Sequence, residues 1–369
     1  MQPTLVILLV AGCVAASCAL VGTFLVLRQM SLLGDAISHS VLPGIVIAFL
    51  LTGDRSPLPM LLGAGALGVV TVLLVELFNR TKRLKEDASI GVVFPALFSL
   101  GVILIARYAS QVDLDLDCVL YGEIAYAPLD VLFVGDRVIG PKALWVNGGV
   151  LLLVALFVAL LYKELKLSTF DPALAGALGF SPLLLHYLLM SAVSITVVGA
   201  FESVGAILVV AMLVVPAAAA HLLTDRLGLM LTIAVGLGVT SALLGYALAR
   251  ALDASIAGSM ATATGALFAL AFLLSPRYGM LARGLRNRRV GRAMREQLLL
   301  LHLRRGGDGL AVPQLAQRFG WSRQGLEGVV GRLRSRGWIE SVGGGIRLTP
   351  SGAATIEASG QSPLRHRDP

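Results

Sequence analysis

Nine apolar runs dominate the first 275 residues, and most of them have the length of a membrane span. A helix needs about 20 apolar residues to cross the hydrocarbon core of a bilayer. The runs cover residues 4–27, 37–52, 57–78, 88–106, 143–162, 182–200, 203–223, 228–249 and 256–274. The second run is short and contains Pro43 and Gly44, which fits a broken or re-entrant helix. The pattern therefore predicts an all-α polytopic membrane bundle of eight or nine transmembrane helices over residues 1–275.

The composition of the chain excludes a water-soluble globule. Hydrophobic residues make up 56% of the 369 residues and charged residues only 14%, whereas about 25% of the residues in an ordinary soluble domain are charged. Residues 1–275 carry 13 Lys and Arg against 16 Asp and Glu, and residues 276–369 carry 17 against 6. A nearly neutral membrane body is therefore followed by a basic tail.

The orientation of the body follows from the loop at 79–87. This loop holds Arg80, Lys82, Arg83 and Lys85, and short loops rich in Lys and Arg face the cytoplasm. The next loop is then outside, and the C-terminal tail is cytoplasmic in a multi-pass protein of the cell membrane. Nine spans place the N-terminus outside and a re-entrant second segment places it inside, and the sequence leaves both open.

Asp35 and His39 are ionisable residues at the start of the second run. Charged groups at membrane depth are rare, costly and usually functional. A spacing of four residues places the carboxylate and the imidazole on one face of a helix, where they suit a divalent cation such as Mn²⁺, Zn²⁺ or Fe²⁺. Two ligands are half a site, which a symmetric dimer doubles. The alternative is an internal Asp–His hydrogen bond or a helix cap.

Other polar residues of the body carry weaker signals. Asp113, Asp115 and Asp117 alternate in the predicted outer segment, where they either steer cations to an entrance or form a solvated acidic loop. His186 lies near a predicted cytoplasmic face and is interpreted as a helix-end residue.

The predicted cytoplasmic loop at 163–181 contains a short capped helix. Asp171 precedes Pro172, which is typical of a helix start, and Gly179 follows an Ala/Leu segment. An amphipathic helix along the membrane would present a docking surface, and the alternative is a loop helix that packs on the bundle. The chain has no nucleotide-binding motif, so any ATP hydrolysis must come from another chain.

Five segments in order resemble motifs of the permease subunits of zinc/manganese-type metal ABC importers (the ABC-3 family). They are SLLGDAISHSVLPGIVIAFLL (31–51), EDASIGVVFPALFSLGVILIA (86–106), DLDCVLYGEI (115–124), KLSTFDPALAGALG (166–179) and FESVGAILVVAMLVVPAAAAHLL (201–223). The resemblance covers about residues 5–280. It implies a permease without enzymatic activity of its own, a second permease as identical copy or sister subunit, a cytoplasmic ATPase subunit, and an extracytoplasmic metal-binding protein.

The resemblance also assigns roles to residues. It implies that Asp35 and His39 line the path of the metal, and that the segment 168–179 is the coupling helix that docks on the ATPase. The coupling residues are Ser168, Thr169, Phe170, Asp171, Pro172, Ala173, Leu174, Ala177 and Gly179. A His stands in the family where this chain has Cys118, so a metal role at that position is in doubt.

The expected function is import of a divalent metal by alternating access, with ATP hydrolysis in a partner subunit. No permanently bound cofactor is expected, because Mn²⁺, Zn²⁺ or Fe²⁺ is the cargo, and one carboxylate and one imidazole leave the three metals open. The alternatives are a permease for a metal chelate and a membrane-tethered, metal-responsive regulator that binds DNA.

The segment 294–352 predicts a small winged-helix domain. Helices are expected at 294–303, 312–320 and 322–337, followed by two strands around a run of three glycines. This order is typical of winged-helix domains and resembles the amino-terminal domains of metal-responsive repressors of the diphtheria-toxin-repressor type.

The basic residues of the tail have several possible partners. Four arginines lie on or beside the third predicted helix: Arg323, Arg332, Arg334 and Arg336. They suit DNA, anionic lipid or an ATPase surface. Since a reader tethered to the membrane finds few DNA sites, docking or regulation is preferred over DNA binding. Residues 276–293 are expected to form a basic juxtamembrane linker and residues 353–369 a disordered tail.

Overall fold

The described part of the chain forms two units, the membrane unit Met1–Gly279 and the tail unit Met280–Pro369. The computed structural model describes residues 2–40, 42–53, 57–80, 86–108, 124–134, 137–275, 279–305, 312–342 and 345–360. The helices of the membrane unit are α1 (Pro3–Leu27), α2 (Leu32–Ser40), α3 (Leu42–Thr52), α4 (Pro57–Arg80), α5 (Glu86–Tyr108), η1 (Ile124–Tyr126), α7 (Lys142–Leu160), α8 (Tyr162–Phe170), α9 (Pro172–Ala177), α10 (Pro182–Val204), α11 (Ala206–Leu223), α12 (Leu227–Leu252) and α13 (Ile256–Leu274).

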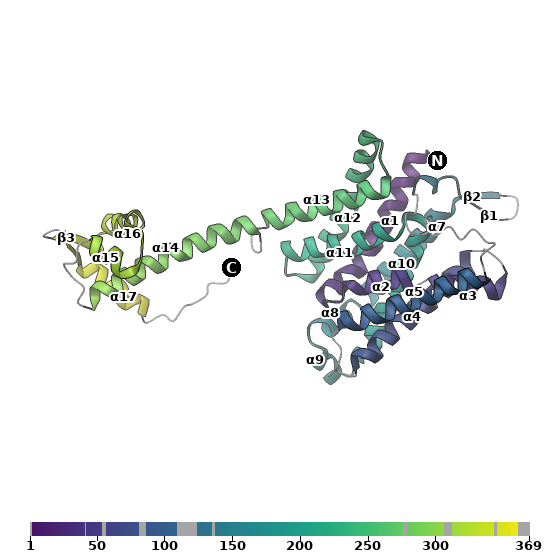
Figure 1. Ribbon diagram of the computed structural model, residues 1–369, viewed down its shortest axis with the longest axis horizontal. Coiled ribbons are helices and arrows are strands. Elements are labelled where there is room, and N and C mark those ends of the chain that lie inside the picture. Colours follow the sequence, from purple (N-terminus) through teal and green to yellow (C-terminus); the bar gives the residue numbers. More distant parts are fainter. Residues whose placement is uncertain are drawn as a thin grey trace. The chain divides into compact units, whose positions relative to one another are not determined.

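The membrane unit is a helical bundle (Figure 1). Within the described residues, nine segments are long and apolar enough to cross a membrane, which confirms the predicted polytopic bundle. The second segment is Leu32–Thr52; its described parts are α2 and α3, and residue 41 lies outside the described residues, as does the prediction of a broken helix there.

Helix α1 lies at the centre of the membrane unit, in contact with α7, α10, α11 and α12. Its side chains are apolar on every face, and Val10, Val14, Val21 and Phe24 are each at most 1% exposed. A helix that is apolar all round is typical of an interior position. Four of the other long helices therefore pack directly against α1.

Gly22 allows the backbones of α1 and α11 to approach closely. A Cβ atom at position 22 would collide with the carbonyl oxygen of Leu213, and backbone atoms cannot move aside as a flexible side chain does. We expect Gly22→Ala to destabilise the purified permease by about 2 kcal/mol or more, measured by thermal denaturation in detergent. Gly12→Ala in the same helix is the matched control, because a Cβ there meets nothing within 4 Å; equal losses in both variants would contradict the prediction.

The membrane unit is not purely helical, so the all-α prediction was wrong in one detail. Strands β1 (Val131–Val134) and β2 (Arg137–Pro141) form an antiparallel pair with a register shift between Leu132 and Phe133. The sequence carries the signal in β-branched and aromatic residues on both sides of Gly135 and Asp136. This hairpin lies at the opposite end of the bundle from α8 and α9 (Figure 1).

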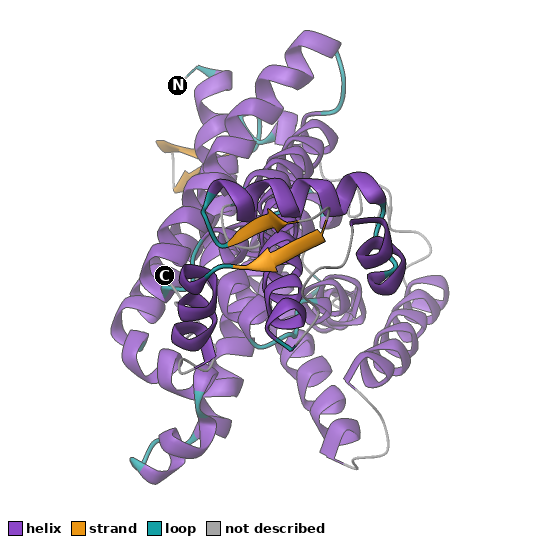
Figure 2. Cartoon of the chain, turned by 90° about the vertical axis from the view of Figure 1, so that its left-hand side faces the viewer, coloured by secondary structure: helices purple, strands orange, loops and turns teal. Residues whose placement is uncertain are grey.

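The tail unit contains four helices and one hairpin. They are α14 (Met280–Arg304), α15 (Val312–Phe319), α16 (Arg323–Ser335), β3 (Ile339–Val342), β4 (Gly345–Leu348) and α17 (Pro350–Gly360). The strands β3 and β4 pair antiparallel, and both hairpins of the chain are drawn in orange in Figure 2. Leucines of α14, α15 and α16 form the core together with Ile339 and Ile346 of the hairpin.

Two boundaries of the tail differ from the sequence prediction. The expected linker at 276–293 falls largely within α14, which begins at Met280 and continues through the predicted first helix. The expected disordered tail at 353–369 begins inside α17, and residues 361–369 lie outside the described residues. Helix α17 packs closely on the start of the β3–β4 hairpin, because Gly352 lies against the carbonyl of Trp338.

Candidate metal and coupling sites

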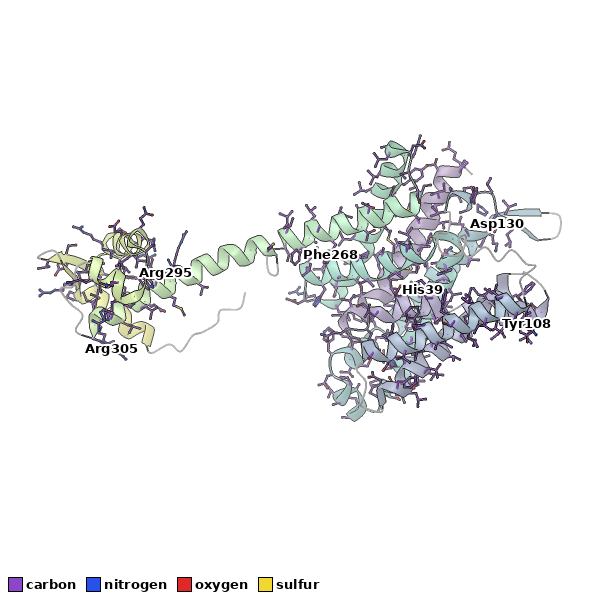
Figure 3. The ribbon with its side chains drawn as sticks, viewed as in Figure 1. His39, Tyr108, Asp130, Phe268, Arg295 and Arg305 are labelled. Carbon is purple, nitrogen blue, oxygen red and sulfur yellow. The ribbon has the colours of Figure 1, made fainter. Side chains whose placement is uncertain are left out.

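Helix α2 carries Asp35 and His39 on one face. The helical spacing predicted from the sequence brings them together, with His39 Nε2 3.5 Å from Asp35 Oδ1. The Asp35 side chain is 48% exposed and the His39 side chain 30% exposed, although His39 lies among the helices of the membrane unit (Figure 3). Both groups therefore open to the same side of a single chain, where a further ligand can reach them.

The opposite face of α2 anchors the helix in the bundle. Leu33 and Ile37 are at most 1% exposed, and the helix contacts α4, α5, α10 and α11. Ser40 Oγ lies 2.7 Å from Thr71 Oγ1 of α4. Because one face is fixed by packing and a hydrogen bond, the two ionisable side chains on the other face are held in place relative to the bundle.

Aromatic rings from α5 border the imidazole of His39. Its ring centroid lies 5.7 Å from that of Phe94 and 6.4 Å, edge-on, from that of Phe98. These rings restrict the imidazole and limit water on that side. In the part of the chain that the structure describes, no three His, Cys, Asp or Glu side chains come together. One chain thus presents two adjacent donors, a hard oxygen and a borderline nitrogen, which is an incomplete ligand set for a divalent cation.

The predicted coupling segment consists of the end of α8, the short helix α9 and the turn that follows. Asp171 caps α9, because its Oδ1 accepts a hydrogen bond of 2.9 Å from the amide of Leu174. Gly179 has φ +88°, a left-handed conformation that suits glycine at a helix end. The residue types that marked a capped helix in the sequence therefore play the expected local roles.

The coupling segment has an inner and an outer part. Phe170 is 57% exposed, Leu174 46% and Leu178 60%, and Asp171, Pro172, Ala173, Ala177 and Gly179 are also exposed. Ser168 is buried and Thr169 is half-buried. The outer part is thus an apolar protein surface, here called the docking surface (170–179), whereas the first two predicted residues face the bundle.

Arg28 bonds both of these side chains, and it was not among the predicted site residues. Its Nη2 donates to Ser168 Oγ (2.8 Å), and its Nε donates to Thr169 Oγ1 (3.2 Å). Its Nη1 lies 3.5 Å from Nδ1 of His186, so His186 is part of this cluster as well as a residue near a helix end. A lone cation at the end of the first apolar run was the available signal.

The predicted entrance acids Asp113, Asp115 and Asp117 lie outside the described residues, as does Cys118. Among the neighbouring described residues, Asp130 Oδ2 lies 3.5 Å from Lys142 Nζ. These two line a cavity of about 150 Å³ with Tyr126, Val146 and Ser203. Because a lysine occupies this cavity, it is a poor place for a cation.

Two of the four arginines predicted on or beside the third tail helix form internal ion pairs. Arg332 Nε donates to Glu296 Oε1 (2.8 Å), and Arg336 Nη1 donates to Glu296 Oε2 (3.1 Å). Arg336 also lies over the ring of Trp338, 5.1 Å from its centroid. Arg334 is exposed, and the side chain of Arg323 is outside the described set. Arg332 and Arg336 thus join α14 to α16 and its end, and both side chains remain partly exposed.

Known proteins match the chain over the membrane unit and, in one case, beyond it. The ABC 3 transport family matches residues 1–275. The manganese transport system membrane protein MntD of Bacillus subtilis is 50% identical over 273 residues, 74% of this chain and 92% of that protein. The zinc transport system membrane protein TroD of Treponema pallidum is 45% identical over 362 residues, 96% of this chain and 98% of that protein. Among solved structures, PsaBC from Streptococcus pneumoniae in complex with Fab contains a similar chain, with 31% identity, a TM-score of 0.63, and coverage of 75% of this chain and 94% of that one.

Proposed function

We propose, since the chain belongs to the ABC 3 transport family, that it is the membrane permease of an ATP-binding-cassette importer and carries Mn²⁺, Zn²⁺ or Fe²⁺ into the cytoplasm. The main structural support for this proposal is the Asp35–His39 pair. It presents an oxygen and a nitrogen ligand on one open helix face, and these ligands suit bare divalent metals. The similarity to membrane proteins of manganese and zinc transport systems supports the same class of cargo.

The metal path is completed by a second permease, either an identical copy or a sister subunit. One chain offers two ligands, and a divalent cation that leaves water needs more than two. A two-fold pairing of α2 faces would place two carboxylates and two imidazoles around one ion. The open side of Asp35 and His39 fits such an interface, because both side chains are partly exposed in the single chain.

The docking surface (170–179) is where an ATPase subunit would bind. Exposed apolar side chains on a capped helix are typical of a protein interface. Positively charged loops favour the cytoplasm, which supports a cytoplasmic position for this surface and the end of α1, with the β1–β2 hairpin outside. The basic composition of the tail unit supports a cytoplasmic position for it as well. The hairpin end would then receive metal from an extracytoplasmic metal-binding protein, with Asp113, Asp115 and Asp117 as steering charges.

The tail unit is proposed to be a winged-helix domain that regulates or retains the partner subunits. Three helices followed by a hairpin, α14 to β4, support the domain type. Docking is preferred over DNA binding, because Arg332 and Arg336 already bond Glu296. The match to TroD over 96% of the chain favours a role within the transporter.

Uptake by reconstituted vesicles tests the proposed function. The permease is incorporated with its ATPase subunit, and the accumulation of Mn²⁺, Zn²⁺, Fe²⁺ and a ferric siderophore is measured with and without ATP. ATP-dependent accumulation of at least one bare metal is expected. Accumulation of the chelate alone would contradict the assignment and favour a permease for metal chelates.

Removal of the tail unit tests its independence from the membrane unit. We expect a chain without residues 280–369 to insert normally and to keep its melting temperature, because the two units have separate cores. What should change is retention of the ATPase or the response of uptake to metal supply. Membrane yield, thermal denaturation and co-purification of the ATPase are the measurements. A degraded or unassembled membrane unit would show that the tail belongs to the structural core.

A further inference from the structure

Arg28 is a half-buried cation that connects three helices at one end of the bundle. It follows Leu27, the last residue of α1, and its guanidinium reaches hydroxyl oxygens of α8 at 2.8 and 3.2 Å and a ring nitrogen of α10 at 3.5 Å. The partners in α8, Ser168 and Thr169, are 140 and 141 positions away in the chain. The contacts therefore join segments that only the tertiary fold brings together.

The hydrogen bonds of Arg28 compensate the partial burial of its charge. Burial lowers the pKa of its guanidinium, yet arginine keeps its charge in proteins. A charge withdrawn from water requires compensating hydrogen bonds, and bonds to a charged donor are stronger than neutral ones. The planar fork of arginine fits two neighbouring acceptors at once, and Ser168 and Thr169 supply two adjacent hydroxyls.

The backbone after Arg28 leads into α2 through a hydrogen-bonded turn. The amide of Met30 donates to the carbonyl of Leu25 (2.9 Å) and closes the end of α1, and the amide of Leu33 donates to the carbonyl of Met30 (3.1 Å) at the start of α2. Between them, Gln29 has φ +60°, which makes the turn sharp. Arg28 is therefore connected through a short hydrogen-bonded turn to the first turn of α2, the helix that carries Asp35 and His39.

The other end of the connection is the docking surface. Ser168 and Thr169 immediately precede Phe170, where that surface begins, and Asp171 then caps α9. Hydrogen bonds are directional, so α8 cannot move relative to α1 without breaking them. The same two hydroxyls are thus adjacent to the surface proposed for the ATPase and bonded to the turn that precedes the metal-binding helix.

We propose that Arg28 is the positioning residue through which movement of the ATPase-docked segment reaches the metal-binding helix α2. The inference rests on the proposed function, because it presupposes both ATPase docking at 170–179 and metal passage at Asp35 and His39. Arg28 touches neither the metal nor the ATPase in this scheme. Its role is to keep α8, α10 and the α1–α2 turn in one mechanical unit, so that ATP hydrolysis is converted into metal movement.

The test measures metal ions accumulated per ATP hydrolysed by the permease–ATPase complex in vesicles. Arg28→Lys keeps the charge but cannot hold both hydroxyls with one ammonium group, and Thr169→Val removes one acceptor while conserving the shape. We expect the ratio to fall at least about tenfold in Arg28→Lys, the equivalent of one lost charge-assisted bond, and by a smaller factor in Thr169→Val. ATP hydrolysis and co-purification of the ATPase should stay near the wild-type level. Combining the two changes should lower the ratio no further than Arg28→Lys alone, because they act on one interaction.

Arg250→Lys is the matched control, because Arg250 is exposed in the last turn of α12. This substitution should leave the ratio of metal ions to ATP unchanged. A wild-type ratio in both Arg28→Lys and Thr169→Val would overturn the inference. So would a lower melting temperature and yield with an unchanged ratio, because Arg28 would then only hold the fold together. Absence of ATP-driven metal uptake by the wild-type complex would instead count against the proposed function itself.

Discussion

Asp35→Asn and His39→Ala are expected to lower metal uptake at least about 100-fold each. Placing a charge at membrane depth costs about 3 kcal/mol, so a cation that loses a compensating ligand there is disfavoured by about a hundredfold in rate or affinity. Asp35→Asn keeps the shape of the side chain and removes the negative charge, and His39→Ala removes the nitrogen donor. Uptake of each metal per unit of permease in vesicles is the measurement.

The alternative role of the pair is an internal contact, since His39 Nε2 already lies 3.5 Å from Asp35 Oδ1. If the pair served only the fold, the melting temperature and membrane yield would fall, while uptake per folded molecule and the order of preference among metals would not change. The two side chains are only partly exposed, and His39 lies against Phe94 and Phe98, so melting temperature and uptake are measured on the same preparation. Normal uptake at normal yield in both variants would exclude a ligand role.

Ser40→Ala is the matched control on the same helix. Ser40 is fully buried, and its hydroxyl lies 2.7 Å from Thr71 Oγ1, so its loss weakens the anchoring of α2 without touching the ligands. We expect a loss of stability of about 1 kcal/mol with unchanged metal preference. Asp35→Asn and His39→Ala should show the opposite pattern, and this contrast separates packing of the helix from chemistry on its open face.

The parts of the structure that the sequence predicted are those set by local or solvent-driven physics. The nine apolar segments were recognisable, because every backbone polar group in a lipid core must be satisfied within a helix and about 20 apolar residues must follow in succession. Asp35 and His39 come together because they are one helical turn apart. The cap at Asp171 follows from a hydrogen bond to an amide three positions later. Each of these features is specified within a few residues.

The features that escaped prediction depend on long-range contacts or weak signals. Arg28 meets partners 140 to 158 positions away, and no local pattern reports such a pairing. Arg332 and Arg336 looked like free basic residues, because the sequence does not show that Glu296, 36 and 40 positions earlier, lies between them. The β1–β2 hairpin has only four and five residues per strand, and short strands beside long apolar helices are easily overlooked.

Changing two alanines of the docking surface (170–179), Ala173→Arg together with Ala177→Arg, is expected to uncouple transport from ATP hydrolysis. Both alanines are exposed on α9, whereas Ala175 between them is 0% exposed and supports the helix from within. Two arginines would add charge and bulk to an apolar interface, where buried unpaired charges cost several kcal/mol.

Uptake driven by ATP should therefore fall at least about 100-fold, together with co-purification of the ATPase, while the permease keeps its yield and melting temperature. Ala254→Arg is the control, because Ala254 is exposed in the turn after α12, outside the docking surface. This substitution should leave uptake and co-purification of the ATPase unchanged. Three quantities are measured on each variant: uptake, the amount of ATPase retained, and thermal denaturation. Full ATPase retention and full uptake in the double variant would move the ATPase contact away from α9. The comparison with Arg28→Lys then separates ATPase docking from the coupling of hydrolysis to transport. The α9 variant should lose the bound ATPase. The Arg28 variant should keep the ATPase and its ATP hydrolysis but lose the metal transport that hydrolysis drives.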